Sequence, residues 1–94
     1  MRELLYKRSK GFVEKKIGDD LVLVPLANSV VQMEKVFSLN ELGTFVYSLM
    51  EKCISADELL LNILSQFDVS KEEAIGDLDT FLSEAVNNKI IEIY

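Results

Sequence analysis

The chain has 94 residues, with ten lysines and arginines, sixteen aspartates and glutamates, one cysteine and no histidine, for a net charge of −6. This length predicts one small domain, and an apolar content of 49% favours a folded chain over a disordered one. The composition excludes an internal disulfide, a zinc site and Ser–His or Cys–His catalysis within this chain. We therefore expect a protein that is not an enzyme and needs no cofactor.

The apolar runs are too short to span a membrane, and Arg2 is not followed by a hydrophobic stretch. These features, with a single cysteine, favour a cytoplasmic location. Residues 1–54 carry eight basic and seven acidic side chains, whereas residues 55–94 carry two lysines and nine acids. The acidic half contributes to solubility and also favours a basic partner over nucleic acid.

The first half of the chain shows short β-type runs. Residues 1–11 form a basic N-terminal arm, either loosely held or packed on a neighbour, and residues 12–94 form the domain. Residues 12–17 and 21–26 predict two strands joined by a turn at Gly18. Pro25 cannot donate to a ladder, so we expect it at a strand end or on an edge.

Residues 30–33 and 36–38 are two more β-type runs, separated by Glu34 and Lys35. They form either a tight hairpin or one kinked strand, and the sequence does not decide between these. In both cases the strand comes late in the sheet, so we expect it at an edge.

Three amphipathic helices follow. The first is predicted over residues 39–52, opened by a capping box of Ser38 and Glu41, with Cys53 buried on its apolar stripe. Ser55 with Glu58 and Ser70 with Glu73 form two further capping boxes and predict where the second and third helices begin.

The apolar positions of the third helix cover an arc of roughly 140°, wider than the ~100° of a simple surface helix. This width indicates either a central helix or a groove along one margin, near Ile75, Asp79, Leu82 and Val86. Residues 89–94 show an alternating pattern of side chains, which predicts a short final strand similar to the wing of a winged helix. The fold class is therefore α+β and winged-helix-like, with a small N-terminal antiparallel sheet followed by three helices.

Several runs in this order resemble the PqqD-like family. The run FSLNELG at residues 37–43 resembles the family's LNxxG pattern, and SADELL at 55–60 resembles its TxEEL helix. Residues 66–70 and 77–91 resemble the link and the end of its third helix. Asn88 and Lys89 depart from the glycine that the family often has before its final apolar pair.

The resemblance implies a non-catalytic recognition element for ribosomally made, post-translationally modified peptides. Such a module binds the leader of a precursor peptide and presents it to a separate modifying enzyme, often a radical S-adenosylmethionine protein. In the family the leader adds as a strand to the sheet edge and lies against the third helix. The peptide-binding residues implied here are Met33, Glu34, Lys35, Val36, Phe37 and Ser38 on the strand, and Leu78, Asp79, Leu82 and Val86 on the helix.

Three alternatives remain open at this point. In the first alternative, the chain is a winged-helix DNA-binding regulator, although the acidic second half of the chain opposes contact with phosphates. In the second alternative, the chain is a structural or dimerising subunit of a larger enzyme. In the third alternative, Val36 and Phe37 are plain core residues and the basic arm covers the edge. The sequence does not give the leader, the modification chemistry or the oligomeric state.

Overall fold

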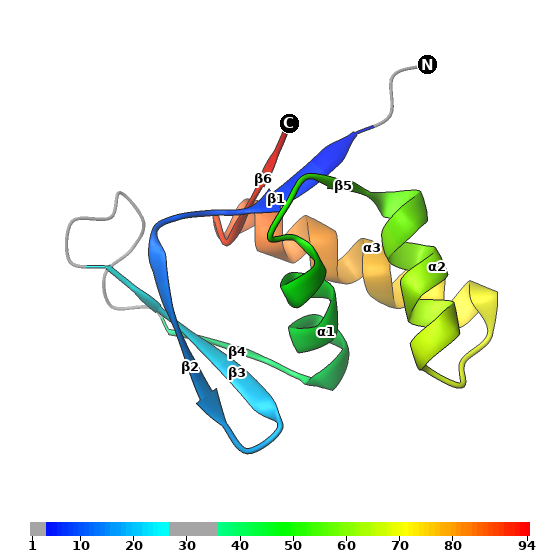
Figure 1. Cartoon of the computed structure of the whole chain (residues 1–94), viewed down its shortest axis with the longest axis horizontal. Helices are drawn as coiled ribbons and strands as arrows, with labels where there is room; N and C mark the ends of the chain where they lie inside the picture. Colours follow the sequence, from blue (N-terminus) through cyan, green and yellow to red (C-terminus); the bar gives the residue numbers. More distant parts are fainter. Residues whose placement is uncertain (1–3, 27–35) are drawn as a thin grey trace.

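The computed structural model describes residues 4–26 and 36–94, which form three helices and two small antiparallel sheets (Figure 1). The predicted α+β fold with three helices is confirmed. In chain order the elements are β1 (Leu5–Arg8), β2 (Phe12–Ile17), β3 (Asp20–Pro25), β4 (Phe37–Leu39), α1 (Glu41–Leu49), β5 (Ile54–Ser55), α2 (Ala56–Gln66), α3 (Lys71–Asn87) and β6 (Ile91–Ile93).

The first sheet has the strand order β2-β3-β4, and we call it the hairpin sheet. Ile17 pairs with Asp20 across the turn, where Gly18 has a φ of 62°. A positive φ at the first central residue is the feature of a type II′ turn, which glycine accommodates without strain. Pro25 is the last residue of β3, as predicted, so its missing N–H does not interrupt the ladder.

The second sheet has the order β5-β1-β6, and we call it the terminal sheet. It brings together strands from the start, middle and end of the chain, which is why the sequence did not show it. Of the basic arm, residues 5–8 form its central strand, β1, so they do not cover the edge of β4. The predicted final strand is present as β6, paired with β1.

The second and third helices begin where the sequence predicted. Ser55 accepts a hydrogen bond from the N–H of Glu58 at 3.2 Å, and Ser70 accepts one from the N–H of Glu73 at 3.1 Å. Each serine thus satisfies a backbone donor that the first helical turn leaves free. The confirmed caps fix α2 and α3 as separate helices.

The start of α1 differs from the prediction. Asn40, not Ser38, caps the helix, and its Oδ1 accepts a hydrogen bond from the N–H of Gly43 at 2.8 Å. Ser38 instead lies inside β4, where it pairs with Val22 of β3. Pairing with β3 keeps the chain extended to Leu39, so the helix starts two residues later than a cap at Ser38 requires.

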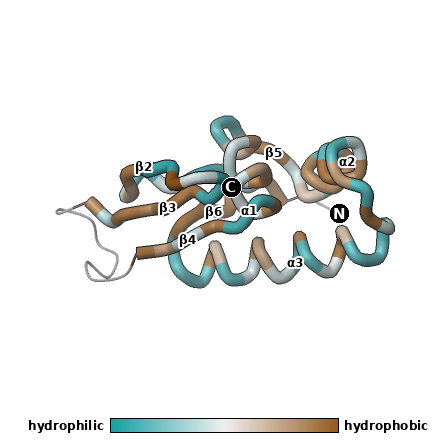
Figure 2. Tube along the Cα trace, turned by 90° about the horizontal axis from the view of Figure 1, so that it is seen from below, coloured by the Kyte–Doolittle hydropathy of each residue, from teal (hydrophilic) through white to brown (hydrophobic). Residues whose placement is uncertain are grey.

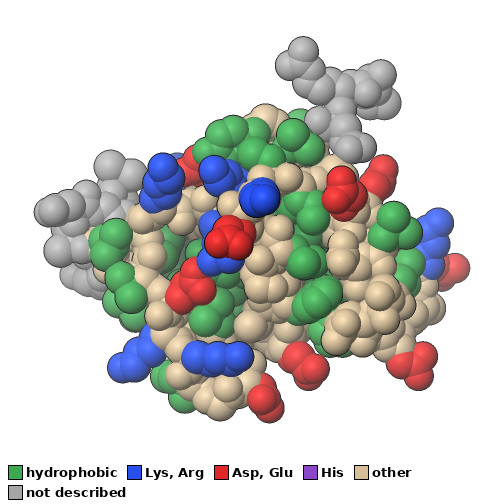
Figure 3. Space-filling view, in the orientation of Figure 1, with side chains coloured by type: hydrophobic (Ala, Val, Ile, Leu, Met, Phe, Trp, Pro, Cys, Tyr) green, Lys and Arg blue, Asp and Glu red, His purple; other side chains and the backbone are tan. Residues whose placement is uncertain are grey.

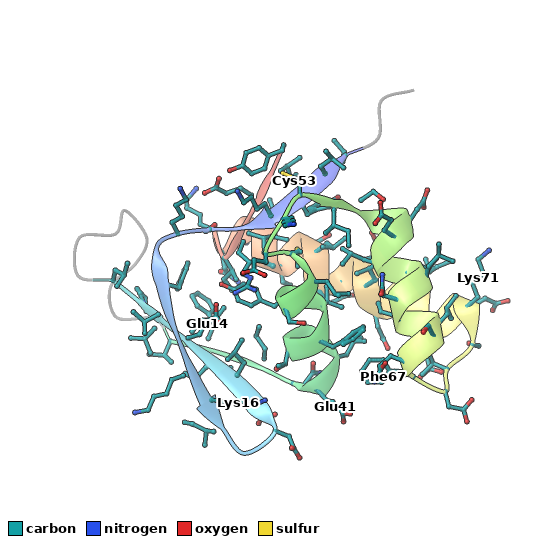
Figure 4. The ribbon with its side chains drawn as sticks, viewed as in Figure 1. Glu14, Lys16, Glu41, Cys53, Phe67 and Lys71 are labelled. Carbon is teal, nitrogen blue, oxygen red and sulfur yellow. The ribbon has the colours of Figure 1, made fainter. Side chains whose placement is uncertain are left out.

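The end of α1 also differs, and this changes the position of Cys53. The helix ends at Leu49, and Cys53 lies three residues past its C-cap, in the exposed link before β5 (Figure 4). The prediction of a buried thiol on the helix stripe was wrong. Because β5 pairs with β1, the chain leaves the helix early to reach the terminal sheet.

The core lies between the two sheets and the three helices. Its fully buried side chains come from β3, α1 and its C-cap, α2 and β6: Leu23, Val46, Tyr47, Met50, Leu59, Ile63 and Ile91. Figure 2 shows α3 running along one side of the molecule, beneath the strands. It contributes Ala74, Leu78, Leu82 and Ala85 to the core, so the wide apolar arc includes a central helix face.

Charge is unevenly distributed over the surface. On the face drawn in Figure 3, lysines and arginines gather over β1 and the β2–β3 hairpin, whereas acidic side chains dominate around α2. Helix α3 carries five carboxylates and one lysine, Lys71, at its first residue. In the described part of the chain, no helix has both the length and the apolar character to cross a membrane.

Candidate functional site: the open edge of β4

Strand β4 is an edge of the hairpin sheet, with β3 as its partner on one side among the described strands. Its described pairs with β3 run from Phe37 to Leu39. An edge strand presents backbone N–H and C=O groups that another extended chain can pair with. Which of these groups face outward follows from the ladder.

In the hairpin sheet, the N–H of Leu26 donates to the C=O of Gly11 at 2.9 Å. Alternate residue pairs of an antiparallel ladder exchange such bonds. Counting along β3 from this pair, Val22 directs its N–H and C=O toward β2, and its two neighbours direct theirs toward β4. Ser38 is the partner of Val22, so the N–H and C=O of Ser38 point to the open side of β4.

A cleft of about 380 Å³ lies beside this edge, between β4 and α3, and we call it the β4–α3 cleft. Among the described residues of its lining, Glu84 is the one ionisable side chain, and the others are apolar, amide or hydroxyl groups. The lining residues are Val36, Phe37, Ser38, Leu39, Asn40, Gly43, Phe81, Glu84, Ala85, Asn88 and Ile90. Figure 2 shows β4 next to the C-terminal half of α3.

The strand side of the cleft combines exposed and packed side chains. Val36 is 58% exposed, so it offers apolar surface to a ligand. Phe37 is half-buried and stacks edge-on against Phe12 of β2, with ring centroids 5.9 Å apart. The interpretation of both residues as plain core therefore does not hold for Val36.

The structure does not bring the two predicted halves of the peptide site together. Val36, Phe37 and Ser38 line the β4–α3 cleft, whereas Met33, Glu34 and Lys35 lie outside the described residues. On the helix side, Leu78 is a core residue with 5% exposure. Asp79, Leu82 and Val86 line another cleft, of about 360 Å³, between α3 and the terminal sheet.

The reason is the periodicity of α3. Successive residues are about 100° apart, so Asp79 and Val86 lie on one shoulder of the core stripe. Phe81, Glu84 and Asn88 lie on the other shoulder, roughly half a turn away, and this second shoulder faces β4. The hydrophobic pattern locates the stripe between the shoulders, but only tertiary packing decides which shoulder meets the strand.

Comparisons with known proteins show the family of this chain. The family model for coenzyme PQQ synthesis protein D (PqqD) matches residues 20–91. The chain belongs to the PqqD family. The match includes β3, β4 and all three helices, and hence both walls of the β4–α3 cleft. No curated protein matches the chain.

A solved structure of TbiB1 in complex with the TbiA(beta) leader peptide resembles this PqqD-family chain, with a TM-score of 0.73 and 28% sequence identity. The alignment covers 92% of this chain and 94% of that chain. It therefore covers more of the chain than the match to the family model does.

Besides the β4–α3 cleft and the cleft between α3 and the terminal sheet, this PqqD-family chain has a further cleft, which we call the second cleft. It has a volume of about 320 Å³ and lies between the β2–β3 hairpin, α1 and the end of α2. Its lining is mixed, with Lys16, Glu41 and Phe67 labelled in Figure 4. These side chains come from outside the β4–α3 cleft, so this second cleft is separate from it.

The most perturbed ionisable group of the described residues is Tyr47 on α1. Burial raises its pKa from 10.0 to about 12, the negative charge of Glu14 adds to the rise, and Arg8 opposes it. Arg8 of β1 lies over the Tyr47 ring at 5.1 Å and forms an ion pair with Glu14 of β2. The group thus ties the two sheets to α1, and it lies outside the β4–α3 cleft.

Proposed function

We propose that this chain captures the leader segment of a ribosomally made precursor peptide by strand addition to β4. The observation that carries the proposal is the outward N–H and C=O of Ser38, on the side of β4 that pairs with no described strand, beside the β4–α3 cleft. Strand addition provides affinity through main-chain hydrogen bonds, while pockets for alternate side chains provide specificity. The bound leader in the TbiB1 complex supports this function for the present chain.

In this proposal the strand side of the site is residues 33–38, as the family resemblance implies, and the helix side is the shoulder that faces β4. On the helix side we assign Phe81, Glu84 and Asn88, in place of the helix residues implied by the family resemblance, because they line the same cleft as Ser38. A leader strand beside β4 then lies over Phe81 with Val36 at its border. Specificity for the leader comes from its alternate side chains that enter the cleft.

The chain acts as a binding module that presents the leader to a separate modifying enzyme. It contains no histidine, and among the described residues that line the β4–α3 cleft only Glu84 is ionisable, which supports a binding role over acid–base catalysis. By family resemblance the enzyme is often a radical S-adenosylmethionine protein. The chemistry of modification then belongs to that enzyme.

The decisive experiment is a titration of the isotope-labelled chain with the leader of a precursor peptide encoded beside it. Amide shifts in β4 and in residues 81–88 of α3 are expected, saturating at micromolar peptide. The Ser38→Pro variant removes the outward N–H, and it leaves the β3 ladder bonded because that ladder uses the residues on either side. We expect this variant to weaken leader binding about tenfold or more.

The matched control is Ser38→Ala, which removes the hydroxyl and keeps the backbone N–H. It should bind the leader as the wild type does. Equal affinity of the Pro and Ala variants would exclude strand addition at Ser38. Leader-induced shifts confined to the second cleft, around Lys16 and Phe67, would move the site away from β4.

A further inference from the structure

The other shoulder of α3 carries a cleft that the leader site does not use. We call it the α3–β6 cleft; it has a volume of about 360 Å³. It lies between the second half of α3 and the terminal sheet. Its lining residues are Tyr6, Asp79, Leu82, Ser83, Val86, Asn87 and Ile93.

Strand β6 gives this cleft an open sheet edge. Leu5 and Tyr94 exchange two backbone hydrogen bonds, with N···O distances of 2.7 and 3.4 Å. The next pair along the ladder, Tyr6 with Ile93, is therefore a non-hydrogen-bonded pair. The N–H and C=O of Ile93 point away from β1, and β6 has no second neighbour among the described strands.

Apolar surface is exposed along the same shoulder. Ile93 is 47% exposed, and Ile75, one turn before Asp79 on α3, is 46% exposed. Leu82 and Val86 supply the apolar floor between them, because both line the cleft. A contiguous apolar patch rimmed by polar side chains is typical of an interaction surface, and here Leu82, Val86 and Ile93 line one cleft with Asp79 and Ser83.

The charge of the cleft is negative. Asp79 is the one carboxylate among the described residues of its lining, and none of these residues is basic. After Lys71, helix α3 carries carboxylates and no lysine or arginine. Ser83 and Asn87 add neutral hydrogen-bonding groups beside Asp79. The lining thus complements a segment that combines apolar side chains with a lysine or arginine.

We propose that the α3–β6 cleft is the docking site for the modifying enzyme, which inserts an extended segment with apolar side chains and a basic residue that pairs with Asp79. This proposal rests on the proposed function, since it assigns the enzyme's place on the same module. The segment's backbone pairs with Ile93, and its apolar side chains pack on Leu82 and Val86.

The two clefts lie on opposite shoulders of one helix, so their occupants do not compete. Leader binding at β4 leaves Asp79 and Ser83 open, and enzyme docking leaves Ser38 and Phe81 open. A presenting module needs this separation because the leader and the enzyme are held at the same time. Helix α3 then fixes the distance between the leader and the enzyme.

The test uses the purified modifying enzyme encoded beside this chain as the probe, titrated into the chain with its leader bound. Two exposed cleft residues are changed, giving Asp79→Lys and Ser83→Arg. Their matched controls are Asp68→Lys, in the link before α3, and Thr80→Arg, on α3 outside both clefts. All four positions are exposed, so circular dichroism melts should coincide with that of the wild type.

We expect both cleft variants to weaken enzyme binding about tenfold or more, with leader affinity and both controls unchanged. Enzyme affinities of the cleft variants within about twofold of wild type would overturn the docking site and leave the proposed function standing. A wild-type chain that binds the leader but not the enzyme would also overturn it. A wild-type chain that fails to bind the leader would instead refute the proposed function on which the docking site depends.

Discussion

Gly43 of α1 lies directly against the ring of Phe81 of α3. A Cβ at Gly43 would lie 3.2 Å from Cε1 of Phe81 and 3.2 Å from Oδ1 of Asn40. The missing side chain thus lets α1 approach α3 at the floor of the β4–α3 cleft. It also leaves room for the Asn40 side chain to cap the helix.

This contact predicts opposite effects for two glycine substitutions. Gly76 of α3 has nothing within 4 Å of its Cβ position, so Gly76→Ala should raise the free energy of unfolding by about 0.5–1 kcal/mol through helix propensity. Gly43→Ala should lower the free energy of unfolding by about 1 kcal/mol, because crowding against Phe81 outweighs that gain. Urea unfolding measures both, and a stabilised Gly43→Ala would refute the tight contact.

The cap of α1 predicts a difference between two neighbouring residues. Asn40→Ala removes the acceptor for the Gly43 N–H and should cost about 1 kcal/mol of unfolding free energy. Ser38→Ala should change it by less than about 0.5 kcal/mol, because Ser38 is exposed and caps nothing. A larger loss at Ser38 than at Asn40 in thermal unfolding would restore the capping box first expected from the sequence.

The starts of the three helices show where a local sequence pattern predicts the structure correctly and where it fails. Ser55 and Ser70 were predicted as caps from their spacing to a glutamate, and the structure confirms both. Ser38 has the same spacing to Glu41, yet strand pairing with β3 determines its conformation instead. A local pattern fails where a pairing between distant residues competes with it.

The same limit applies to Cys53 and to the candidate site. The link that exposes Cys53 exists because β5 joins a sheet made from both ends of the chain, which no local pattern shows. Among the described strands, β4 lies at an edge, as its place late in the sheet predicted. The helix shoulder that faces it depends on how α3 packs, and the apolar arc was compatible with either one.

The end of α3 predicts a stabilising substitution. Lys89 has a φ of 63°, its N–H donates to the C=O of Val86, and the N–H of Ile90 donates to the C=O of Ala85. This is the Schellman pattern, in which glycine is preferred at the left-handed residue. Lys89→Gly should therefore raise the free energy of unfolding by about 1 kcal/mol.

Lys89→Ala is the control for the loss of the lysine side chain, because alanine has the same difficulty with a positive φ. It should leave the melting temperature near that of the wild type or below it. Equal melting temperatures for the Gly and Ala variants would show that the left-handed conformation costs nothing at this position. The departure from the family's glycine would then have no effect on stability.

Tyr47 predicts a loss of stability at high pH. Its pKa is about 12 in the folded chain and near 10.0 in the unfolded one, so the neutral phenol favours the folded state. This contribution is complete below pH 10 and is lost as the pH rises through 12. It corresponds to about 2–3 kcal/mol, and urea unfolding between pH 9 and pH 12 measures it.

Tyr47→Phe is the matched variant, because phenylalanine keeps the ring and cannot ionise. The difference in unfolding free energy between the wild type and this variant should shift against the wild type by about 2–3 kcal/mol across the window. Parallel pH profiles of the two proteins would contradict the raised pKa. Other tyrosines and lysines ionise equally in both proteins, so they cancel in the comparison.

Two exposed valines, Val36 just before β4 and Val13 in β2, distinguish the proposed leader site from the rest of the hairpin sheet. Val36 is 58% exposed and lines the β4–α3 cleft, whereas Val13 of β2 is 50% exposed and lines none of the three clefts described above. Val36→Ala removes two methyl groups that a leader strand on β4 would bury. At about 0.8 kcal/mol for each fully buried methyl group, and with 58% of Val36 still exposed before binding, leader affinity should fall by about three- to tenfold.

Val13→Ala makes the same chemical change at similar exposure, so both variants should unfold within about 0.5 kcal/mol of the wild type. Leader affinity of Val13→Ala, measured by calorimetry, should match that of the wild type. Equal losses at both positions would indicate a general effect on the sheet, and a loss at Val13 alone would place the leader against β2. A selective loss at Val36 would support the open edge of β4 as the place where the leader binds.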